Sequence, residues 1–200
     1  MSRRIITAGA ALVALTAFAT TASALDLNTK RGYRELGGAI TVTFENDMPQ
    51  AKGAESISGT KLTIAPQFGY FIMDGLEFLG VFELDIPFGE KYENVGTEVG
   101  VQLGIEYFFR LAGPVRPYLG ILVGMDFHVP ADTKANRDAD AKTTKDFNLT
   151  IPLGILIPLF NEHVAADVGL RFTYQVSLEG EEGTDHIVVP LGYLGVRCFW

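Results

Sequence analysis

The residues from Ile187 to Trp200 read IVVPLGYLGVRCFW, and this stretch decides the fold of the chain. Apolar residues alternate along it, which is the period of a β-strand. The stretch ends on an aromatic residue at the last position of the sequence. An apolar strand in this place has an unpaired edge, and a barrel covers that edge by pairing the last strand with the first. We therefore expect this stretch to be the closing strand of a transmembrane β-barrel.

The composition agrees with one domain and excludes several classes of protein. Hydrophobic residues make up 48% of the chain, charged residues 20%, and glycine, which suits bent or crowded strands, occurs 22 times. The formal net charge of −8 argues against a nucleic-acid partner, which requires a basic surface. The single cysteine, Cys198, excludes an internal disulfide, and no Cys/His zinc pattern is present, so we expect no cofactor and no metal.

The first 24 residues are predicted to be a cleaved signal peptide. Arg3 and Arg4 precede an apolar run over residues 5–19, and Ala22-Ser23-Ala24 is a small-residue cleavage pattern. A membrane anchor would need about 20 apolar residues, which is more than this run contains. The mature domain then covers residues 25–200, and the loss of two arginines changes the formal charge from −8 to −10.

Eight segments of alternating polarity follow, and none has the roughly 18 consecutive apolar residues of a helical span. They cover residues 33–45, 60–72, 76–86, 97–110, 115–128, 146–159, 164–178 and 187–200. The length of their apolar rows fits strands that cross an apolar band of about 25 Å. Connections after the odd-numbered segments are long and the others are short, which is typical of outer-membrane barrels. An even number of strands places both termini on the short-turn, periplasmic side.

These features resemble the small outer-membrane β-barrel family, the eight-stranded group that includes the OmpA and OmpX types. The resemblance covers nearly all of residues 25–200 and includes the terminal residues Val196, Cys198, Phe199 and Trp200. Members typically end on an aromatic residue preceded by alternating apolar residues, an ending that the barrel-assembly machinery is thought to read. Trp200 stands where Phe is more usual, and Cys198 stands where an aliphatic or aromatic residue is frequent.

The resemblance implies an all-β fold, a closed antiparallel up-and-down eight-stranded transmembrane β-barrel in the cell outer membrane. Outer-membrane lipid, lipopolysaccharide and the barrel-assembly machinery are the implied partners. The resemblance does not transmit a function, because the same fold hosts many. We expect a structural or interaction protein without catalysis, whose extracellular loops contact a partner that the sequence does not identify.

Along each segment, the positions that alternate with the apolar ones carry charged residues of both signs. We expect these residues inside the barrel: Lys61, Glu77, Glu83, Glu98, Glu106, Arg110, Arg116, Asp167, Arg171 and Arg197. Eight strands leave a lumen just wide enough for side chains, and buried charges are tolerated when they are paired. A lumen filled by paired charges is therefore the favoured interpretation, and a narrow ion channel is the alternative. We expect Glu106 and Arg171 to have partners of opposite charge. Arg197 should meet Glu35 or Glu77 near the periplasmic end.

Two histidines raise the alternative of a lipid A-modifying enzyme, since some small barrels use His with Ser and an acid. His128 lies close to Asp126 in sequence and His186 follows Asp185, both near the predicted outer rim. Neither forms a His-x-Ser arrangement, and Ser177 is separated from His186 by the last loop. Because a serine needs a base within hydrogen-bonding distance, we expect no catalytic, cofactor-binding or metal-binding residues.

Aromatic residues gather towards the predicted strand ends, where a membrane barrel has girdles at both interfaces. The periplasmic set is Tyr70, Phe71, Tyr107, Phe108, Phe109, Tyr118, Phe160, Phe199 and Trp200. The outer set is Phe44, Phe88, Tyr92, Phe127 and Phe147. In a soluble ligand-binding barrel of the lipocalin type, which is the remaining alternative, these residues would form a core or stack on a ligand.

Overall fold

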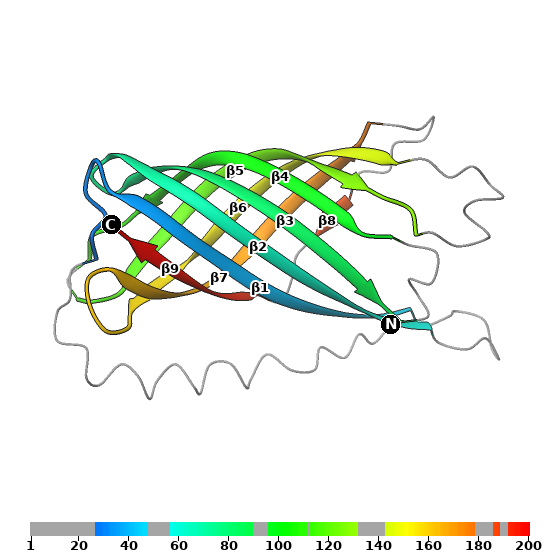
Figure 1. Ribbon diagram of the computed structural model, residues 1–200, viewed down its shortest axis with the longest axis horizontal. Coiled ribbons are helices and arrows are strands. Elements are labelled where there is room, and N and C mark those ends of the chain that lie inside the picture. Colours follow the sequence, from blue (N-terminus) through cyan, green and yellow to red (C-terminus); the bar gives the residue numbers. More distant parts are fainter. Residues whose placement is uncertain are drawn as a thin grey trace, which may run out of the picture.

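The computed structural model describes residues 27–47, 57–89, 96–111, 113–131, 143–178, 186–188 and 192–200. This part of the chain forms strands that close on themselves (Figure 1). The strands are β1 (Arg34–Asp47), β2 (Ile57–Met73), β3 (Leu76–Phe88), β4 (Glu98–Phe108), β5 (Arg116–His128), β6 (Thr144–Pro158), β7 (Val164–Ser177), β8 (His186–Val188) and β9 (Tyr193–Phe199). Within the described ranges, no helix is long and apolar enough to cross a membrane.

The barrel closes through the last part of the chain. Strands β1 to β7 pair in sequence order, each antiparallel to the next. Both β8 and β9 pair with β7, and β9 also pairs with β1, so that β8 and β9 are two parts of one eighth strand. The prediction of a closed eight-stranded antiparallel β-barrel is confirmed.

The eighth strand is interrupted between its two parts. Thr173 pairs with Val188 and Gly169 pairs with Tyr193. These pairs are four residues apart on β7 but five apart on the eighth strand, so one extra residue lies between β8 and β9. A change of register of this kind alters the alternation along a strand. Gly192, which directly precedes β9, has a φ of 130°, a conformation that favours glycine.

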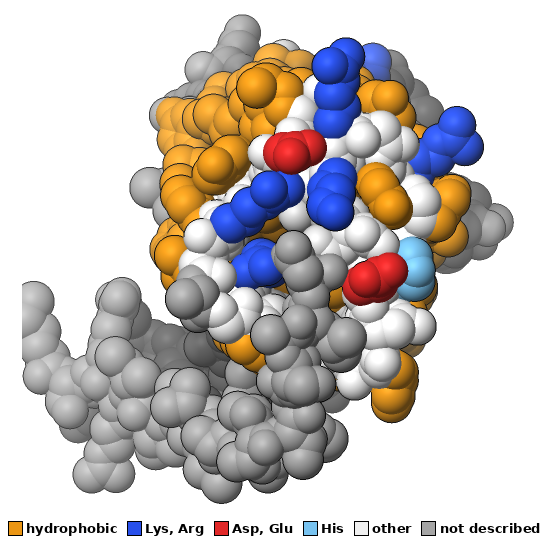
Figure 2. All heavy atoms as spheres, turned by 90° about the vertical axis from the view of Figure 1, so that its left-hand side faces the viewer, with side chains coloured by type: hydrophobic (Ala, Val, Ile, Leu, Met, Phe, Trp, Pro, Cys, Tyr) orange, Lys and Arg blue, Asp and Glu red, His pale blue; other side chains and the backbone are white. Residues whose placement is uncertain are grey.

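The outer face of the barrel is an apolar belt. Leu36, Ile40, Phe68, Leu103 and Val123 are 47–57% exposed, and they come from five positions spread over β1, β2, β4 and β5. Figure 2 views the barrel from its short-turn end and shows hydrophobic side chains along much of the visible perimeter. Soluble monomers rarely expose contiguous apolar surface of this extent, whereas lipid solvates it. A membrane also requires that backbone polar groups be paired, and the closed barrel meets this requirement because it leaves no open strand edge in hydrocarbon.

Aromatic residues at the short-turn end form two sets rather than one girdle. The exposed set lies where a girdle would be: Tyr70, Tyr107, Phe109, Phe160 and Trp200. The girdle prediction is wrong for four residues that are buried inside the barrel: Phe71, Phe108, Tyr118 and Phe199. Strand alternation explains the difference, since the neighbour of an outward residue points inward. At the other end Phe88 and Phe147 are exposed and Phe127 is half-buried, while the side chains of Phe44 and Tyr92 lie outside the described set.

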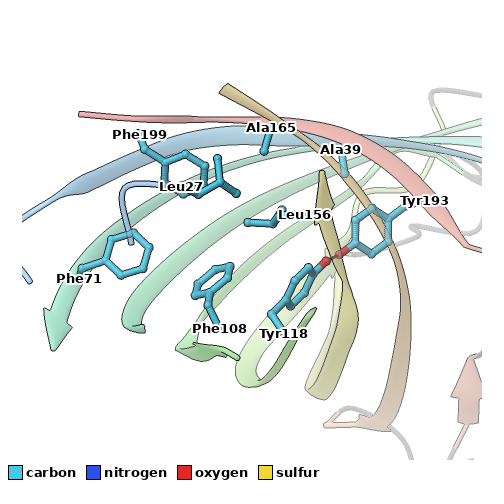
Figure 3. Close-up of a cluster of buried hydrophobic side chains, with 9 residues drawn as sticks. All are labelled: Leu27, Ala39, Phe71, Phe108, Tyr118, Leu156, Ala165, Tyr193 and Phe199. Carbon is cyan, nitrogen blue, oxygen red and sulfur yellow. Dashed lines mark hydrogen bonds between the residues drawn. The ribbon is translucent and has the colours of Figure 1, made fainter. Parts of the chain in front are cut away.

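The segment before β1 closes the short-turn end of the lumen. Leu27 is buried against the aromatic cluster that contains Phe71 and Phe199 (Figure 3). Two backbone hydrogen bonds hold this segment to neighbouring turns: Asn28 N–H donates to the Glu162 carbonyl at 3.1 Å, and Gly75 N–H donates to the Thr29 carbonyl at 2.8 Å. The lumen therefore ends in an apolar plug, which the alternating segments did not predict.

Candidate functional site in the barrel lumen

Arg197 is the centre of the short-turn half of the lumen. Its side chain on β9 is only 1% exposed, on the face opposite Val196 and Trp200. The guanidinium Nε donates to Asp167 Oδ2 at 2.7 Å, and Nη1 donates to Glu106 Oε2 at 2.7 Å and to Glu35 Oε2 at 3.3 Å. One cation thus joins carboxylates from β1, β4 and β7, and we call these four residues the Arg197 network.

Neutral polar and aromatic groups complete the surroundings of this network. Gln67 Nε2 donates to Glu35 Oε1 at 2.5 Å, and the Tyr118 hydroxyl donates to Asp167 Oδ1 at 2.6 Å. The hydroxyls of Tyr118 and Tyr193 also hydrogen-bond each other, as Figure 3 shows. The Arg197 guanidinium carbon lies 4.6 Å from the centre of the Tyr118 ring, a favourable cation–π contact.

Glu77 is beside the Arg197 network but does not join it. It is 0% exposed, and neither of its carboxylate oxygens has a hydrogen-bond partner among the described residues. Cross-strand pairing places Glu77 directly opposite Glu106, so two carboxylates face each other. The prediction that Arg197 meets Glu35 or Glu77 is confirmed through Glu35. Gly69 gives Glu77 its space, because a Cβ at position 69 would overlap the Glu77 carboxylate.

The outer half of the lumen contains a second set of charges around a cavity of about 110 Å³. Lys61 Nζ lies 2.5 Å from Asp85 Oδ2 and 3.3 Å from Glu98 Oε2. Arg171 pairs with Glu83. As predicted, Glu106 and Arg171 each have a partner of opposite charge inside the barrel. We call this space the outer cavity.

Two residues of the predicted charge set behave differently from the rest. Arg116 is buried, but its Nη1 donates to the carbonyls of Leu111 and Gly113 in the turn before β5, at 3.0 and 3.2 Å. Arg110 is not in the lumen, and the prediction that placed it there is wrong. Because β4 ends at Phe108, alternation no longer controls its direction, and its side chain is 46% exposed.

Arg110 instead belongs to the short-turn surface. Its Nη2 lies 3.5 Å from Asp74 Oδ2, and the backbone N–H of Arg31 donates to Asp74 Oδ1 at 2.9 Å. This hydrogen bond, together with the nearby Arg110 charge, holds the pKa of Asp74 below its ordinary value. Figure 2 shows the concentration of basic side chains at this end.

His128 lies at the rim of the outer cavity between two carboxylates. Its Nε2 is 2.9 Å from Asp146 Oδ2, and its Nδ1 is 3.4 Å from Glu98 Oε2. Both ring nitrogens therefore face acids, and neither is directed at a serine as a general base requires. Asp185 and the His186 side chain lie outside the described residues. Among those described, no group of three or more His, Cys, Asp or Glu could hold a metal ion.

The terminal residues on β9 alternate between the two faces. Val196, Cys198 and Trp200 are exposed, while Phe199 packs in the lumen. The end of the strand is fixed to β1, because Trp200 N–H donates to the Arg34 carbonyl at 3.0 Å and Arg34 N–H donates to the Trp200 carbonyl at 2.8 Å. Their role as an assembly signal stays a prediction.

The sequence did not identify the neutral partners of the Arg197 network, chiefly Gln67 and Tyr118, which are both buried. Their inward parity was available as a signal. Alternation places such residues inside the barrel, but it does not show which charged groups they bond.

Comparison with known structures finds the same fold in solved outer-membrane proteins. The crystal structure of Neisserial surface protein A matches with a TM-score of 0.54 and 19% identity, over 84% of this chain and 96% of that one. The outer membrane protein OprG from Pseudomonas aeruginosa matches with a TM-score of 0.51 and 15% identity, over 89% and 99%. No protein-family model matches the sequence, and no curated protein matches it either. The predicted resemblance is confirmed at the level of structure: the chain has the fold of the small eight-stranded outer-membrane β-barrels.

Proposed function

We propose that this chain is a non-catalytic protein of the outer membrane, whose lumen is closed and whose extracellular loops make the functional contacts. The apolar belt supports a lipid environment, since it surrounds a barrel without an open edge. The proposed partners are outer-membrane lipid and lipopolysaccharide around the belt, and the barrel-assembly machinery during insertion. The loop partner is not specified by the described residues.

The filled short-turn half of the lumen is the observation that carries this proposal. The Arg197 network crosses the barrel with side chains that are at most 2% exposed. Next to it lies the aromatic cluster, and Leu27 closes the end (Figure 3). A solute or ion would have to separate a buried arginine from its carboxylates, which costs several kcal/mol for each uncompensated charge. The geometry therefore favours a closed barrel over a channel.

A narrow channel is the second candidate, because polar and charged side chains line the outer cavity in one half of the lumen. It would require the Arg197 network to rearrange. The two candidates therefore differ in one measurable property, which is ion conductance.

The experiment is single-channel recording on the mature protein in planar bilayers. Folding is checked first by the mobility of unheated protein on SDS gels, because folded barrels migrate differently from boiled ones. The proposal expects no discrete current steps. Reproducible steps that change size in a Glu106→Gln variant, but keep their size in an exposed Glu162→Gln control, would establish the channel instead.

Orientation is tested separately. We propose that both termini face the periplasm, since residues 27 and 200 lie at the short-turn end. A protease-sensitive tag fused before Leu25 should survive treatment of intact cells and be cut only after the outer membrane is permeabilised. Cleavage in intact cells would reverse the orientation.

A further inference from the structure

The charges around the outer cavity do not balance. Four carboxylates and two cations line it: Glu83, Asp85, Glu98, Asp126, Lys61 and Arg171. Glu83 pairs with Arg171, while Asp85 and Glu98 share Lys61. Asp126 is buried, and within the described ranges its partner is an uncharged amide, Gln175 Nε2 at 2.9 Å. A buried carboxylate without a counter-charge is costly, so this arrangement favours an added cation.

Hydrogen bonding gives a second and independent indication of the same kind. Gln102 is 2% exposed and lines the cavity. Its Nε2 donates to Glu83 Oε2 at 2.9 Å, which fixes the other amide atom, Oε1, as an acceptor without a partner among the described residues. Among the residues that line the cavity, Asp85 Oδ1 is a second acceptor in that condition, against one unpartnered donor, Arg171 Nε. The buried Asn148 near Gln102 adds one unpartnered donor and one unpartnered acceptor, which leaves the difference unchanged. The cavity therefore lacks positive charge and donors rather than acceptors.

We propose that the outer cavity is a binding site for a small organic ammonium ion, held by Asp126 and Gln102. An ammonium group supplies the missing positive charge and several N–H donors at once. A metal ion fits less well, because no described group of three or more acids, histidines or cysteines could hold one. An anion is disfavoured by the excess of carboxylates. The cavity of about 110 Å³ admits a methylammonium ion with water.

Access to this site is from the long-loop end. Lys61 and Glu98 at that side are 29% and 18% exposed, whereas the Arg197 network on the other side is buried. The site is thus a blind pocket rather than part of a path. The proposal does not depend on closure of the short-turn half, and a conducting barrel would leave it intact.

The test is titration of the folded, detergent-solubilised mature protein with methylammonium chloride, monitored by the NMR signals of the Gln102 and Gln175 side-chain amides. We expect saturable shifts of these signals. Tetramethylammonium, which has the same charge but no N–H donor, should bind with at most a tenth of the affinity of methylammonium. Equal affinity for the two ions would overturn recognition by hydrogen bonding, and no saturable shift with methylammonium would overturn the site.

Variants separate the site from general electrostatics. Asp126→Asn keeps the size of the side chain and should weaken methylammonium binding at least tenfold. Asp74→Asn removes the same charge from the opposite end of the barrel and should leave binding unchanged. Unchanged binding in Asp126→Asn, or an equal loss in Asp74→Asn, would contradict the proposal. The comparison of the two ions in the wild-type protein needs no variant, so the test stands even if Asp126→Asn folds poorly.

Discussion

The two halves of the lumen solve the problem of buried charge in different ways. In the short-turn half a single arginine joins three carboxylates, and these side chains are at most 2% exposed beside the aromatic cluster. In the outer half Lys61 and Arg171 make separate pairs around a cavity, and the Lys61 side chain keeps 29% exposure. The comparison shows that similar residues contribute differently according to burial. An ion pair near water is worth little, whereas breaking a buried one leaves charges that nothing solvates.

The largest expected effect follows from removing the shared arginine. Arg197→Met leaves Glu35, Glu106 and Asp167 buried without their cation, and we expect a loss of about 3–5 kcal/mol in the free energy of unfolding. Urea titration of the barrel in lipid vesicles, monitored by gel mobility, measures it. Arg197→Lys is the control that keeps the charge but loses the two-sided donor geometry, and it should fall between wild type and Arg197→Met. A loss below about 1 kcal/mol for Arg197→Met would mean that the network does not stabilise the barrel.

Substitution of Glu77, in the same half of the lumen, is expected to stabilise the barrel rather than destabilise it. Its carboxylate is buried, lacks hydrogen-bond partners among the described residues and faces Glu106 across the strand pair. Replacing it by an apolar residue of similar length, Glu77→Met, should therefore raise the free energy of unfolding by about 1–2 kcal/mol, as removal of an unsatisfied buried group does. The same urea titration measures the gain. Glu35→Met is the matched comparison and should destabilise, because Glu35 is bonded to Arg197 and Gln67.

If Glu77→Met and Glu35→Met destabilised equally, the distinction between a bonded and an unbonded carboxylate in this half would be lost. The result would then indicate that Glu77 has a partner, such as an ordered water.

In the outer half, Lys61→Met is the substitution that corresponds to Arg197→Met. Lys61→Met removes a cation that contacts two carboxylates, as Arg197→Met does in the other half. Because the Lys61 side chain keeps 29% exposure, whereas that of Arg197 is 1% exposed, we expect a smaller loss than for Arg197→Met, about 1–2 kcal/mol. The loss should shrink further at high salt, whereas the loss caused by Arg197→Met should not, since buried pairs are screened less. Equal losses for the two variants would remove burial as the explanation of the difference between the halves.

The strands and the side chains that face the lumen could both be predicted from the alternation of apolar and polar residues. Alternation with period two gives each strand and also decides which side chains face the lumen. Arg197 illustrates this, because its parity relative to Trp200 was sufficient to place it inside. The rule fails where strands end or slip. Arg110 lies beyond the end of β4, and the extra residue between β8 and β9 shifts the alternation of the eighth strand.

Partners across the lumen could not be predicted in the same way. Which carboxylate reaches Arg197 depends on the tilt and stagger of strands that are distant in sequence. Asp167, which bonds Arg197 at 2.7 Å, comes from the neighbouring strand β7, while the carboxylate of Glu77 on β3 has no hydrogen-bond partner among the described residues. Leu27 lies outside any alternating segment, so no periodic signal marks it as a plug. Its burial depends on the turns to which the N-terminal segment binds.

The smallest expected effect lies outside the lumen, where Asp74 is exposed and accepts a hydrogen bond from the Arg31 backbone N–H. Its pKa is lowered in the folded protein, so the ionised form stabilises the fold at pH values above the ordinary pKa of an aspartate. That contribution should disappear as the pH falls below about 4 and the carboxylate is protonated. Asp74→Asn should therefore be slightly less stable than wild type at neutral pH, with the difference vanishing in acid. Glu162→Gln at the same end is the control for general surface charge. At pH about 2 the carboxylate is protonated, so a difference in stability between wild type and Asp74→Asn that persisted there could not come from charge. It would have to come from a changed geometry of the turn, and it would contradict the electrostatic explanation.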